Sequence, residues 1–309
     1  VYNKCTEAGF DGMVMPHVTT LPRYVVQKGT AAALDFAAVT AQASRIFKVY
    51  NKQLPGLADS CKKASIRAWQ WALQHSDMPF NQNAFNNQFE PKITTGGYGD
   101  GNFRDEWFWA ACELLVTTND KQYADTIQQR WSDTLQLPSW NNVKALGLYT
   151  LLRHKSVFNH LKGFTYAQAT SRLVQFAQRL INEGDRAYQT IMGGNRNDFV
   201  WGSNSVAMNQ SIVLINTYLV TKETKYLNEA LNNLDYVLGR NATGYCFLTG
   251  FGSKKVMHPH HRPSVADGIE DPVPGLLSGG PNPGQQDRCE GYPSRMPAES
   301  FLDADCSYA

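Results

Sequence analysis

The sequence predicts an all-α fold built from antiparallel helical hairpins. Apolar residues recur at spacings of three and four through most of the first 238 residues, as they do on one face of a helix. These stretches come in pairs joined by short polar turns. After Gly239 the composition changes, and eight of the fourteen prolines lie from Pro259 onward. We therefore expect a helical part followed by a long ordered loop.

The helices are predicted from apolar spacing and from breaks in it. Leu54-Pro-Gly ends the first stretch. The apolar residues that recur there at helical intervals are Phe36, Val39, Ala43, Ile46, Phe47 and Tyr50. Successive pairs of this kind predict stacked hairpins, for which an α-solenoid and an α/α barrel are the two architectures. The predicted helices cover residues 29–50, 56–75, 105–117, 121–135, 141–154, 165–182, 204–220 and 224–238.

Composition excludes several classes of function. The chain has 309 residues, which one large domain can hold, and no segment resembles an interdomain linker. Net charge is +2 with the basic residues scattered among acids, so we expect no nucleic-acid partner. No apolar run approaches the length of a membrane span, so we expect no membrane role. Aromatic residues make up 12%, which suits either stacking on sugar rings or a large core.

A histidine-rich segment is the most informative local feature. His258, His260, His261 and Arg262 follow a glycine-rich turn within five residues. The prolines between and after them restrict the backbone, so we expect a stiff loop and not a helix. Imidazole and guanidinium groups on such a loop can bind a polar ligand.

The proline-rich segment 271–287 predicts a second part of the same site. Long ordered loops are uncommon unless they build a site, although a flexible linker is the alternative. Histidine, arginine, acidic and aromatic residues surround this segment, which favours a site. The spacing of the nearby acids nominates none of them for catalysis: Asp267, Asp271, Glu290 and Glu299.

The six cysteines are too sparse for a disulfide-built fold. Cys289 and Cys306 flank a proline-rich loop that a disulfide could pin, which would suit an exported protein. Cys112 lies among apolar residues and is predicted to be buried on a helix. There is no Cys-x-x-Cys pair of the zinc-binding type. The amino terminus shows neither a signal peptide nor a methionine, so we expect a trimmed or processed chain.

The segment from Cys246 to Arg262 resembles the histidine signature of glycoside hydrolase family 9, the endoglucanases and related cellulases. That signature has a glycine, a basic residue and a terminal His-x-Arg at fixed spacing, here Gly252, Lys254, His260 and Arg262. Cys246 departs from the pattern, which has Ser, Thr or Val at that position.

Further segments resemble the same family along nearly the whole chain, at residues 95–111, 197–204 and 238–244. Residues 10–16 and 23–26 resemble the subgroup that carries an immunoglobulin-like domain before the catalytic domain. The resemblance implies an (α/α)6 barrel of helical hairpins that hydrolyses β-1,4-glucan with inversion of configuration.

The second signature of the family is present only in its first part. Phe301, Asp303 and Tyr308 match its opening, but the glutamate that acts as general acid lies beyond Ala309 in the pattern. The Asp-Ala-Gly-Asp motif that supplies the base does not occur in the sequence. We therefore expect residues 1–309 to be most of one catalytic domain, truncated at both edges, with an incomplete barrel.

The resemblance also implies roles for particular residues. His260 and Asp303 are expected in the catalytic site, and His258, Arg262 and Trp201 are expected to bind the substrate. His261 either helps to bind the sugar or holds the loop. Three further aromatic residues are weaker candidates for stacking, and we expect them in the core instead: Tyr98, Trp107 and Trp140.

A calcium site is expected from the same resemblance. In the family, loop carbonyls, a pair of acids and an oxygen-bearing residue after a tryptophan bind calcium. A carboxylate pair with neutral oxygens suits this ion, although acids in a first helical turn also complement the helix dipole. The corresponding positions are Gly101, Asn102, Asp105, Glu106 and Asn141.

The leading hypothesis is a secreted endo-β-1,4-glucanase that acts on cellulose or related β-glucans. The alternative is a non-catalytic glucan-binding helical fragment, which would bind the polysaccharide without turnover. An intracellular α-solenoid for protein partners is a third possibility that the histidine-rich loop disfavours.

Overall fold

The computed structural model describes residues 1–132, 134–184 and 186–309. It divides into two compact units. Unit 1 comprises Val1–Phe10 and Leu21–Ser171, and unit 2 comprises Asp11–Thr20 and Arg172–Ala309. Among the described residues, the strands are β1 (Cys5–Thr6) and β2 (Tyr24–Val25), both in unit 1. They pair antiparallel, with Cys5 opposite Val25.

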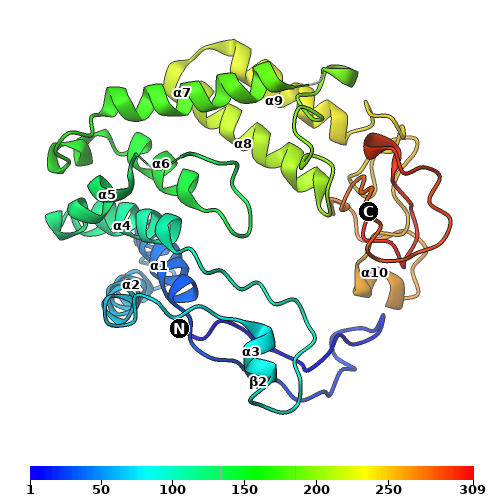
Figure 1. Cartoon of the computed structure of the whole chain (residues 1–309), viewed down its shortest axis with the longest axis horizontal. Coiled ribbons are helices and arrows are strands. Elements are labelled where there is room, and N and C mark those ends of the chain that lie inside the picture. Colours follow the sequence, from blue (N-terminus) through cyan, green and yellow to red (C-terminus); the bar gives the residue numbers. More distant parts are fainter. Residues whose placement is uncertain (133, 185) are drawn as a thin grey trace. The chain divides into compact units, whose positions relative to one another are not determined.

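Unit 1 is built around a cluster of long helices (Figure 1). Helix α4 packs against α1, α6 and α5, and α1 also packs against α2. Every residue of α4 from Asp105 to Leu115 is buried, so this helix is the centre of the unit's core. The helices and short helical turns of this part are α1 (Thr30–Val49), α2 (Leu57–Gln74), α3 (Gln82–Asn86), α4 (Arg104–Thr118), η1 (Lys121–Tyr123), α5 (Ala124–Arg130), α6 (Lys144–Arg153) and η2 (Lys155–His160).

A buried polar network fixes how α1, α4 and α6 meet. Glu113 on α4 is fully buried and pairs with Arg45 on α1. Its other carboxylate oxygen accepts hydrogen bonds from Trp109 Nε1 (3.1 Å) and from Thr150 Oγ1 on α6 (2.6 Å). Because a buried charge is tolerated only when it is paired and hydrogen-bonded, this network favours one register among the three helices.

Unit 2 contains the helical hairpin of α8 and α9, which lie side by side (Figure 1). Helix α7 begins in unit 1 and ends in unit 2. Beyond α9 the chain forms turns and bridges with two short helical turns. The elements are α7 (Tyr166–Glu183), η3 (Ala187–Gln189), α8 (Ser203–Thr221), α9 (Thr224–Val237), α10 (Arg262–Ala266) and η4 (Pro297–Glu299).

All but one of the predicted helices are present with nearly the predicted ends. The exception is the stretch 121–135, which is a 3-10 turn followed by α5 and ends at Arg130. Trp131 then stacks on Phe164, with ring centroids 4.6 Å apart. Position 133 of the predicted helix lies outside the described residues.

The buried face of α1 differs from the apolar stripe that identified the helix. Phe36, Val39, Ile46 and Tyr50 are exposed. Most of the buried side chains of α1, which packs against α2 and α4, are small and allow the helix backbones to approach closely: Ala33, Ala37, Ala38, Ala41 and Ser44, together with Thr30 and Leu34. Periodicity therefore located the helix, but the buried face is a different and mostly small-residue face.

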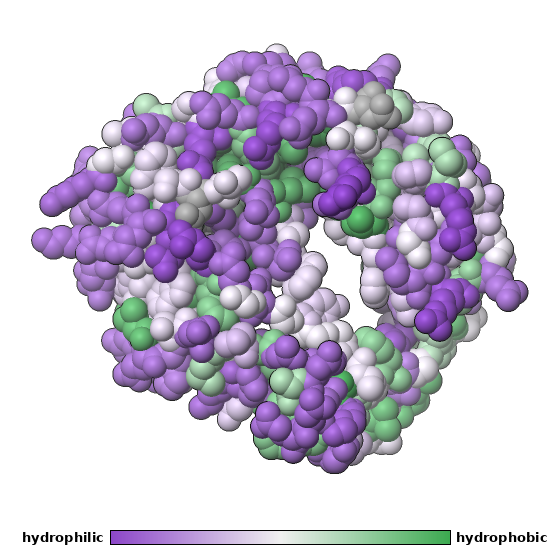
Figure 2. Space-filling model, in the orientation of Figure 1, coloured by the Kyte–Doolittle hydropathy of each residue, from purple (hydrophilic) through white to green (hydrophobic). Residues whose placement is uncertain are grey.

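Hydrophilic residues cover most of the face of the molecule drawn in Figure 2, and hydrophobic residues appear there in separate groups. None of the described helices combines the length and the hydropathy that crossing a membrane requires.

Candidate functional site

The histidine-rich loop is held in unit 2 through its backbone. Asp303 accepts hydrogen bonds from the backbone N–H groups of Met257 (2.9 Å) and His258 (2.8 Å). Bonds from N–H donors to a carboxylate are among the stronger hydrogen bonds in proteins. Asp303 therefore fixes the start of the loop, and its observed contacts are those of a positioning residue.

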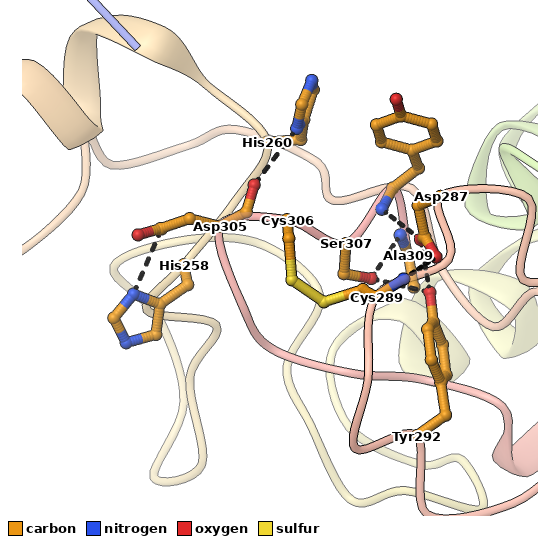
Figure 3. The surroundings of a disulfide bond; sticks show 10 residues. His258, His260, Asp287, Cys289, Tyr292, Asp305, Cys306, Ser307 and Ala309 are labelled. Atoms are coloured by element: carbon orange, nitrogen blue, oxygen red, sulfur yellow. Dashed lines mark hydrogen bonds and ion pairs between the residues drawn. A yellow bond between two sulfur atoms is a disulfide. The ribbon is translucent and has the colours of Figure 1, made fainter. Parts of the chain in front are cut away.

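Two of the histidines face Asp305 (Figure 3). His258 Nδ1 lies 3.3 Å from the Asp305 carboxylate, and His260 Nδ1 lies 3.3 Å from its backbone carbonyl oxygen. The second nitrogen of each ring points away from Asp305 (Figure 3). Because a carbonyl oxygen only accepts, His260 donates through Nδ1, and its Nε2 is an acceptor when the ring is neutral.

The other two polar residues of the loop are more strongly tied to the chain. His261 caps α10, since its Nδ1 lies 2.9 Å from Ser264 Oγ and accepts from Ser264 N at 3.4 Å. Arg262 Nε donates to the backbone oxygen of Asp11 (3.2 Å). Hydrogen bonds from Thr19 and from Gly12 N, together with the Arg262 charge, lower the pKa of Asp11.

The loop is not free of helix, contrary to the prediction from its prolines. Residues Arg262–Ala266 form the short helix α10, with Pro263 in its first turn. Proline is well tolerated there because the first N–H groups of a helix have no partner within it. The correction affects the end of the loop, while His258 and His260 lie outside the helix as expected.

An aromatic stack joins Trp201 to this loop. Trp201 is 60% exposed and lies just before α8. Its ring stacks on Tyr308, with centroids 4.9 Å apart and planes 15° apart. Tyr308 also meets His260 edge to face, with centroids 4.8 Å apart. The structure thus brings together two predicted site residues through a third residue that the sequence had not nominated, although Tyr308 is an aromatic position of the second signature.

The turn that precedes Trp201 is fixed by Asp198, which is buried. Asp198 Oδ2 accepts from the backbone N–H groups of Gly193 (2.9 Å) and Asn195 (3.0 Å). Its Oδ1 accepts from Gln210 Nε2 on α8 (3.3 Å). Burial raises the pKa of Asp198, and the backbone hydrogen bonds partly offset that effect. The segment that presents Trp201 is therefore anchored on the helix that follows it.

The C-terminal tail, residues 287–309, is held by a disulfide and by the Asp287 carboxylate (Figure 3). Cys289 and Cys306 are bonded to each other, as their positions in the sequence suggested. Asp287 accepts from Tyr292 Oη (2.6 Å) and from the backbone N–H of Tyr308 (2.8 Å).

These contacts change the acidity of both side chains. Burial acts to raise the pKa of Asp287, but hydrogen bonds from Tyr292, Tyr308 N and Cys289 N outweigh it and lower the pKa. Burial and the bond to Asp287 raise the pKa of Tyr292 to about 12. The tail is thus stabilised with Asp287 ionised.

The predicted calcium region lies at the start of α4 in unit 1. Asp105 and Glu106 are both buried there, and Asp105 Oδ2 accepts from Val143 N (2.8 Å), which anchors the turn after Asn141. Glu106 Oε2 has no hydrogen-bond partner among the described residues. Burial and the neighbouring Asp105 charge raise the pKa of Glu106 to about 9.

Asp35 on α1 belongs to the same electrostatic environment. Burial, followed by the charges of Asp105 and Asp100, raises the pKa of Asp35 to about 7. One of its oxygens, Oδ1, is buried without a partner in the part of the chain that the structure describes. Neighbouring carboxylates raise one another's pKa when no cation nearby balances their negative charges.

The neutral residues of the predicted calcium set are exposed. Asn141 Oδ1 accepts from Ser139 Oγ (2.7 Å), Asn102 Oδ1 lies 3.4 Å from Arg104 N, and Gly101 is exposed. Within residues 1–132, 134–184 and 186–309, no group of three or more His, Cys, Asp or Glu side chains is arranged to hold a metal ion. A cation here would therefore rely on the two acids and on neutral oxygens.

Tyr98 and Trp140 are on the surface of unit 1, contrary to the prediction that they lie in the core. They are 70% and 65% exposed, and their rings meet edge to face with centroids 5.9 Å apart. Tyr98 follows two glycines and Trp140 follows a proline-containing segment, and both lie in loops outside the helices. Trp107 is buried on α4 as predicted, and so is Cys112.

Comparison with known proteins points consistently to one family. The model of "Glycosyl hydrolase family 9" matches residues 7–309. A "Xyloglucan-specific endo-beta-1,4-glucanase" of Bacteroides ovatus is 42% identical over 100% of this chain and 53% of its own length. The chain thus spans about half the length of this curated relative.

Solved structures agree with the sequence comparison. "Bacteroides ovatus GH9" superposes with a TM-score of 0.90 at 38% identity, over 100% of this chain and 55% of that one. A "structure of AaCel9A in complex with cellobiose-like isofagomine" superposes with a TM-score of 0.84 at 31% identity, over 100% and 57%. The predicted fold class, the (α/α)6 barrel of helical hairpins, is confirmed by these matches.

Proposed function

Because this chain belongs to glycosyl hydrolase family 9, we propose that it is part of an endo-β-1,4-glucanase that acts on cellulose or related β-glucans. The observation that carries the proposal is the exposed Trp201 ring, which Tyr308 joins to His260. An exposed aromatic face next to polar donors suits a sugar ring, whose faces are apolar and whose rim is hydroxylated.

In this proposal Trp201 supports a glucose ring, while His258, His260 and Arg262 bind its hydroxyl groups. His260 Nε2 can accept a hydrogen bond from a hydroxyl when the ring is neutral, since Nδ1 faces the Asp305 carbonyl. The exposed position of His258 supports the same role.

Hydrolysis with inversion needs a protonated acid at the glycosidic oxygen and a base that holds water, about 6.5–9.5 Å apart. Asp303, expected in the catalytic site, is engaged with two backbone N–H groups. Its contacts support a positioning role, and its assignment as a catalytic residue stays a prediction. We assign neither the acid nor the base among the described carboxylates.

Calcium is the cation that we propose for the start of α4. Asp105 and Glu106 fit it, because they are buried acids and Glu106 has an oxygen without a partner. Calcium takes six to eight oxygen ligands, so Gly101, Asn102 and Asn141 would supply neutral ones. The ion would offset the burial and the repulsion from Asp105 that raise the pKa of Glu106.

Export is the location that the proposal implies. The Cys289–Cys306 disulfide supports it, because disulfides persist mainly in oxidising compartments. An immunoglobulin-like domain before the catalytic domain is a further proposal, which rests on the resemblance of residues 10–16 and 23–26 alone.

The test of function pairs intact-mass measurement with assays on carboxymethylcellulose, xyloglucan and, as a control, maltohexaose. The proposal predicts binding of the two β-1,4-glucans and weak or no binding of the α-linked control. Release of reducing ends by a sample whose mass matches 34.5 kDa would place the acid and base within this chain. Binding without release would support the alternative, a glucan-binding fragment. Equal affinity for maltohexaose, or no binding at all, would overturn the proposal.

A further inference from the structure

We propose that Tyr308 is a positioning residue that orients both the Trp201 platform and the His260 imidazole. The proposal deepens the proposed function, since it rests on Trp201 and His260 binding glucan. Tyr308 contacts both rings at once, parallel to Trp201 and edge to face with His260. Each such aromatic pair restrains the orientation of the rings that form it.

The Trp201 residue is 60% exposed, and its ring stacks on Tyr308. The neighbouring Gly202 adopts a left-handed conformation with φ of 84° and begins α8. An exposed ring beside such a turn can adopt several rotamers, and stacking on Tyr308 selects one of them. The same tyrosine ring then sets the distance between the platform and His260.

Tyr308 can serve as a reference point because its own backbone is fixed. The backbone N–H of Tyr308 donates to Asp287 Oδ2 at 2.8 Å. Tyr308 also lies two residues after Cys306, which is joined to Cys289 by the disulfide. On the other side, its carbonyl oxygen lies so close to Gly279 that a Cβ atom there would overlap it. Gly279 in turn accepts a hydrogen bond from Asn204 N at the start of α8 (3.1 Å).

These contacts form a continuous path from the tail to the helix that carries Trp201. Segment 278–280 lies between the backbone of Tyr308 and the first residues of α8, and Asn204 Nδ2 donates to Ser278 O at 3.0 Å. The presence of glycine at 279 is explained by this close approach. The arrangement holds Tyr308 and Trp201 in register without a direct bond between their backbones.

The test uses the whole chain with the substitutions Tyr308→Phe and Tyr308→Leu. Tyr218→Leu is the matched control, because Tyr218 lies near the far end of α8 and contacts Lys222. Three quantities are measured: the NMR chemical shifts of the His260 ring, the fluorescence of Trp201 and the affinity for cellohexaose. The His260 shifts report the nearby tyrosine ring and would not respond to a general loss of stability.

We expect Tyr308→Phe to keep the His260 shifts and to hold the affinity within about twofold, because it keeps the ring. Tyr308→Leu should move the His260 shifts, change the Trp201 fluorescence and weaken cellohexaose binding by about tenfold, the equivalent of one aromatic pair. The proposal is wrong if Tyr308→Leu behaves like Tyr218→Leu in both the shifts and the affinity.

A second variant protects the test against misfolding of Tyr308→Leu. Gly279→Ala displaces the backbone of Tyr308 without altering its ring, and should also move the His260 shifts and weaken binding. Unchanged shifts in a folded Gly279→Ala protein would count against the proposal. If the unmodified chain binds no cellohexaose, the proposed function fails, while the His260 shifts still decide whether Tyr308 positions that ring.

Discussion

The start of α4 holds buried acids and the C-terminal tail holds partly buried ones, and the two regions satisfy them in opposite ways. In the tail, Asp303 and Asp287 accept hydrogen bonds from backbone N–H groups, and the pKa of Asp287 is lowered. At α4, Glu106 has an oxygen without a partner, and its pKa is raised to about 9. The first arrangement stabilises a loop, whereas the second would gain from a cation.

The largest effect should come from the covalent link in the tail. Replacing Cys289 and Cys306 by serine opens a loop with a sequence separation of 17. Chain-entropy estimates for a loop of this size predict a loss of about 3 kcal/mol in the free energy of unfolding. Urea unfolding followed by circular dichroism measures it.

Reduction provides the control for this variant. A reducing agent should destabilise the unmodified chain and leave the double-serine variant unchanged, because the remaining cysteines are unpaired in the structure. Equal urea midpoints for the unmodified chain with and without reductant would contradict a stabilising disulfide.

At the start of α4, calcium should raise the melting temperature of the unmodified chain. At a free concentration of 100 times Kd, a cation that binds only the folded state stabilises it by about 2.7 kcal/mol. Glu106→Gln should abolish that increase. It should also raise the stability measured in EDTA at neutral pH, because the buried Glu106 carboxyl must take up a proton on folding and glutamine need not. Differential scanning calorimetry with calcium and with EDTA measures both.

Glu90→Gln is the matched control, since Glu90 is exposed and pairs with Lys92. It should keep the full calcium response. If the unmodified chain melts at the same temperature in calcium and in EDTA, the acids at α4 do not form a calcium site under those conditions.

Removing the Asp303 carboxylate should cost less than either of these changes. Asp303→Ala leaves the N–H groups of Met257 and His258 without their acceptor, for which we expect a loss of about 2 kcal/mol. Cellohexaose affinity should fall as well, because the loop would lose its fixed start. Asp271→Asn is the control, as it removes only an exposed pair with Lys255.

Chemical denaturation and calorimetric titration of the two variants measure these effects. An Asp303→Ala protein with the stability and affinity of Asp271→Asn would show that the carboxylate does not hold the loop.

The smallest effect is a difference in pH dependence between two acids of unit 2. The pKa of Asp287 is lower in the folded state, so its contribution to stability is present above its unfolded pKa and is lost as the pH falls through the folded pKa. The pKa of Asp198 is raised in the folded state, so its effect on stability has the opposite sign. The stability that Asp198 contributes falls as the pH rises from the unfolded-state pKa of this carboxyl to its folded-state pKa.

Urea midpoints measured between about pH 2.5 and about pH 6 separate the two acids. Asp287→Asn should flatten the loss of stability toward low pH, and Asp198→Asn should steepen it. Identical profiles for the two variants would contradict the assignment of opposite shifts.

The sequence predicted the helices well because the apolar spacing that indicates a helix can be read within one continuous stretch of chain. It did not predict which face of α1 is buried, since Phe36 and Val39 are exposed while the smaller Ala37 and Ala41 pack. The choice depends on how closely two helix backbones approach, and that distance is a property of the packed unit.

The residues of the candidate site were nominated from the sequence, whereas their contacts were not. His258, His260 and Trp201 were nominated from sequence, yet Tyr308, which joins two of them, was not. Asp303 was expected in the catalytic site, which stays a prediction, and the sequence did not predict that its carboxylate accepts loop N–H groups. Such roles follow from distances between segments far apart in the chain. Tyr98 and Trp140 were placed in the core from their aromatic character alone, which does not report burial.

The most direct test of the central claim is calorimetric titration of cellohexaose into the unmodified chain, Trp201→Ala and Tyr98→Ala. If the Trp201 platform of unit 2 binds β-1,4-glucan, Trp201→Ala should weaken binding by about tenfold or more, the equivalent of one lost aromatic contact. Tyr98→Ala tests an exposed aromatic residue of unit 1 and should retain more affinity than Trp201→Ala. Unchanged affinity in Trp201→Ala would contradict the account.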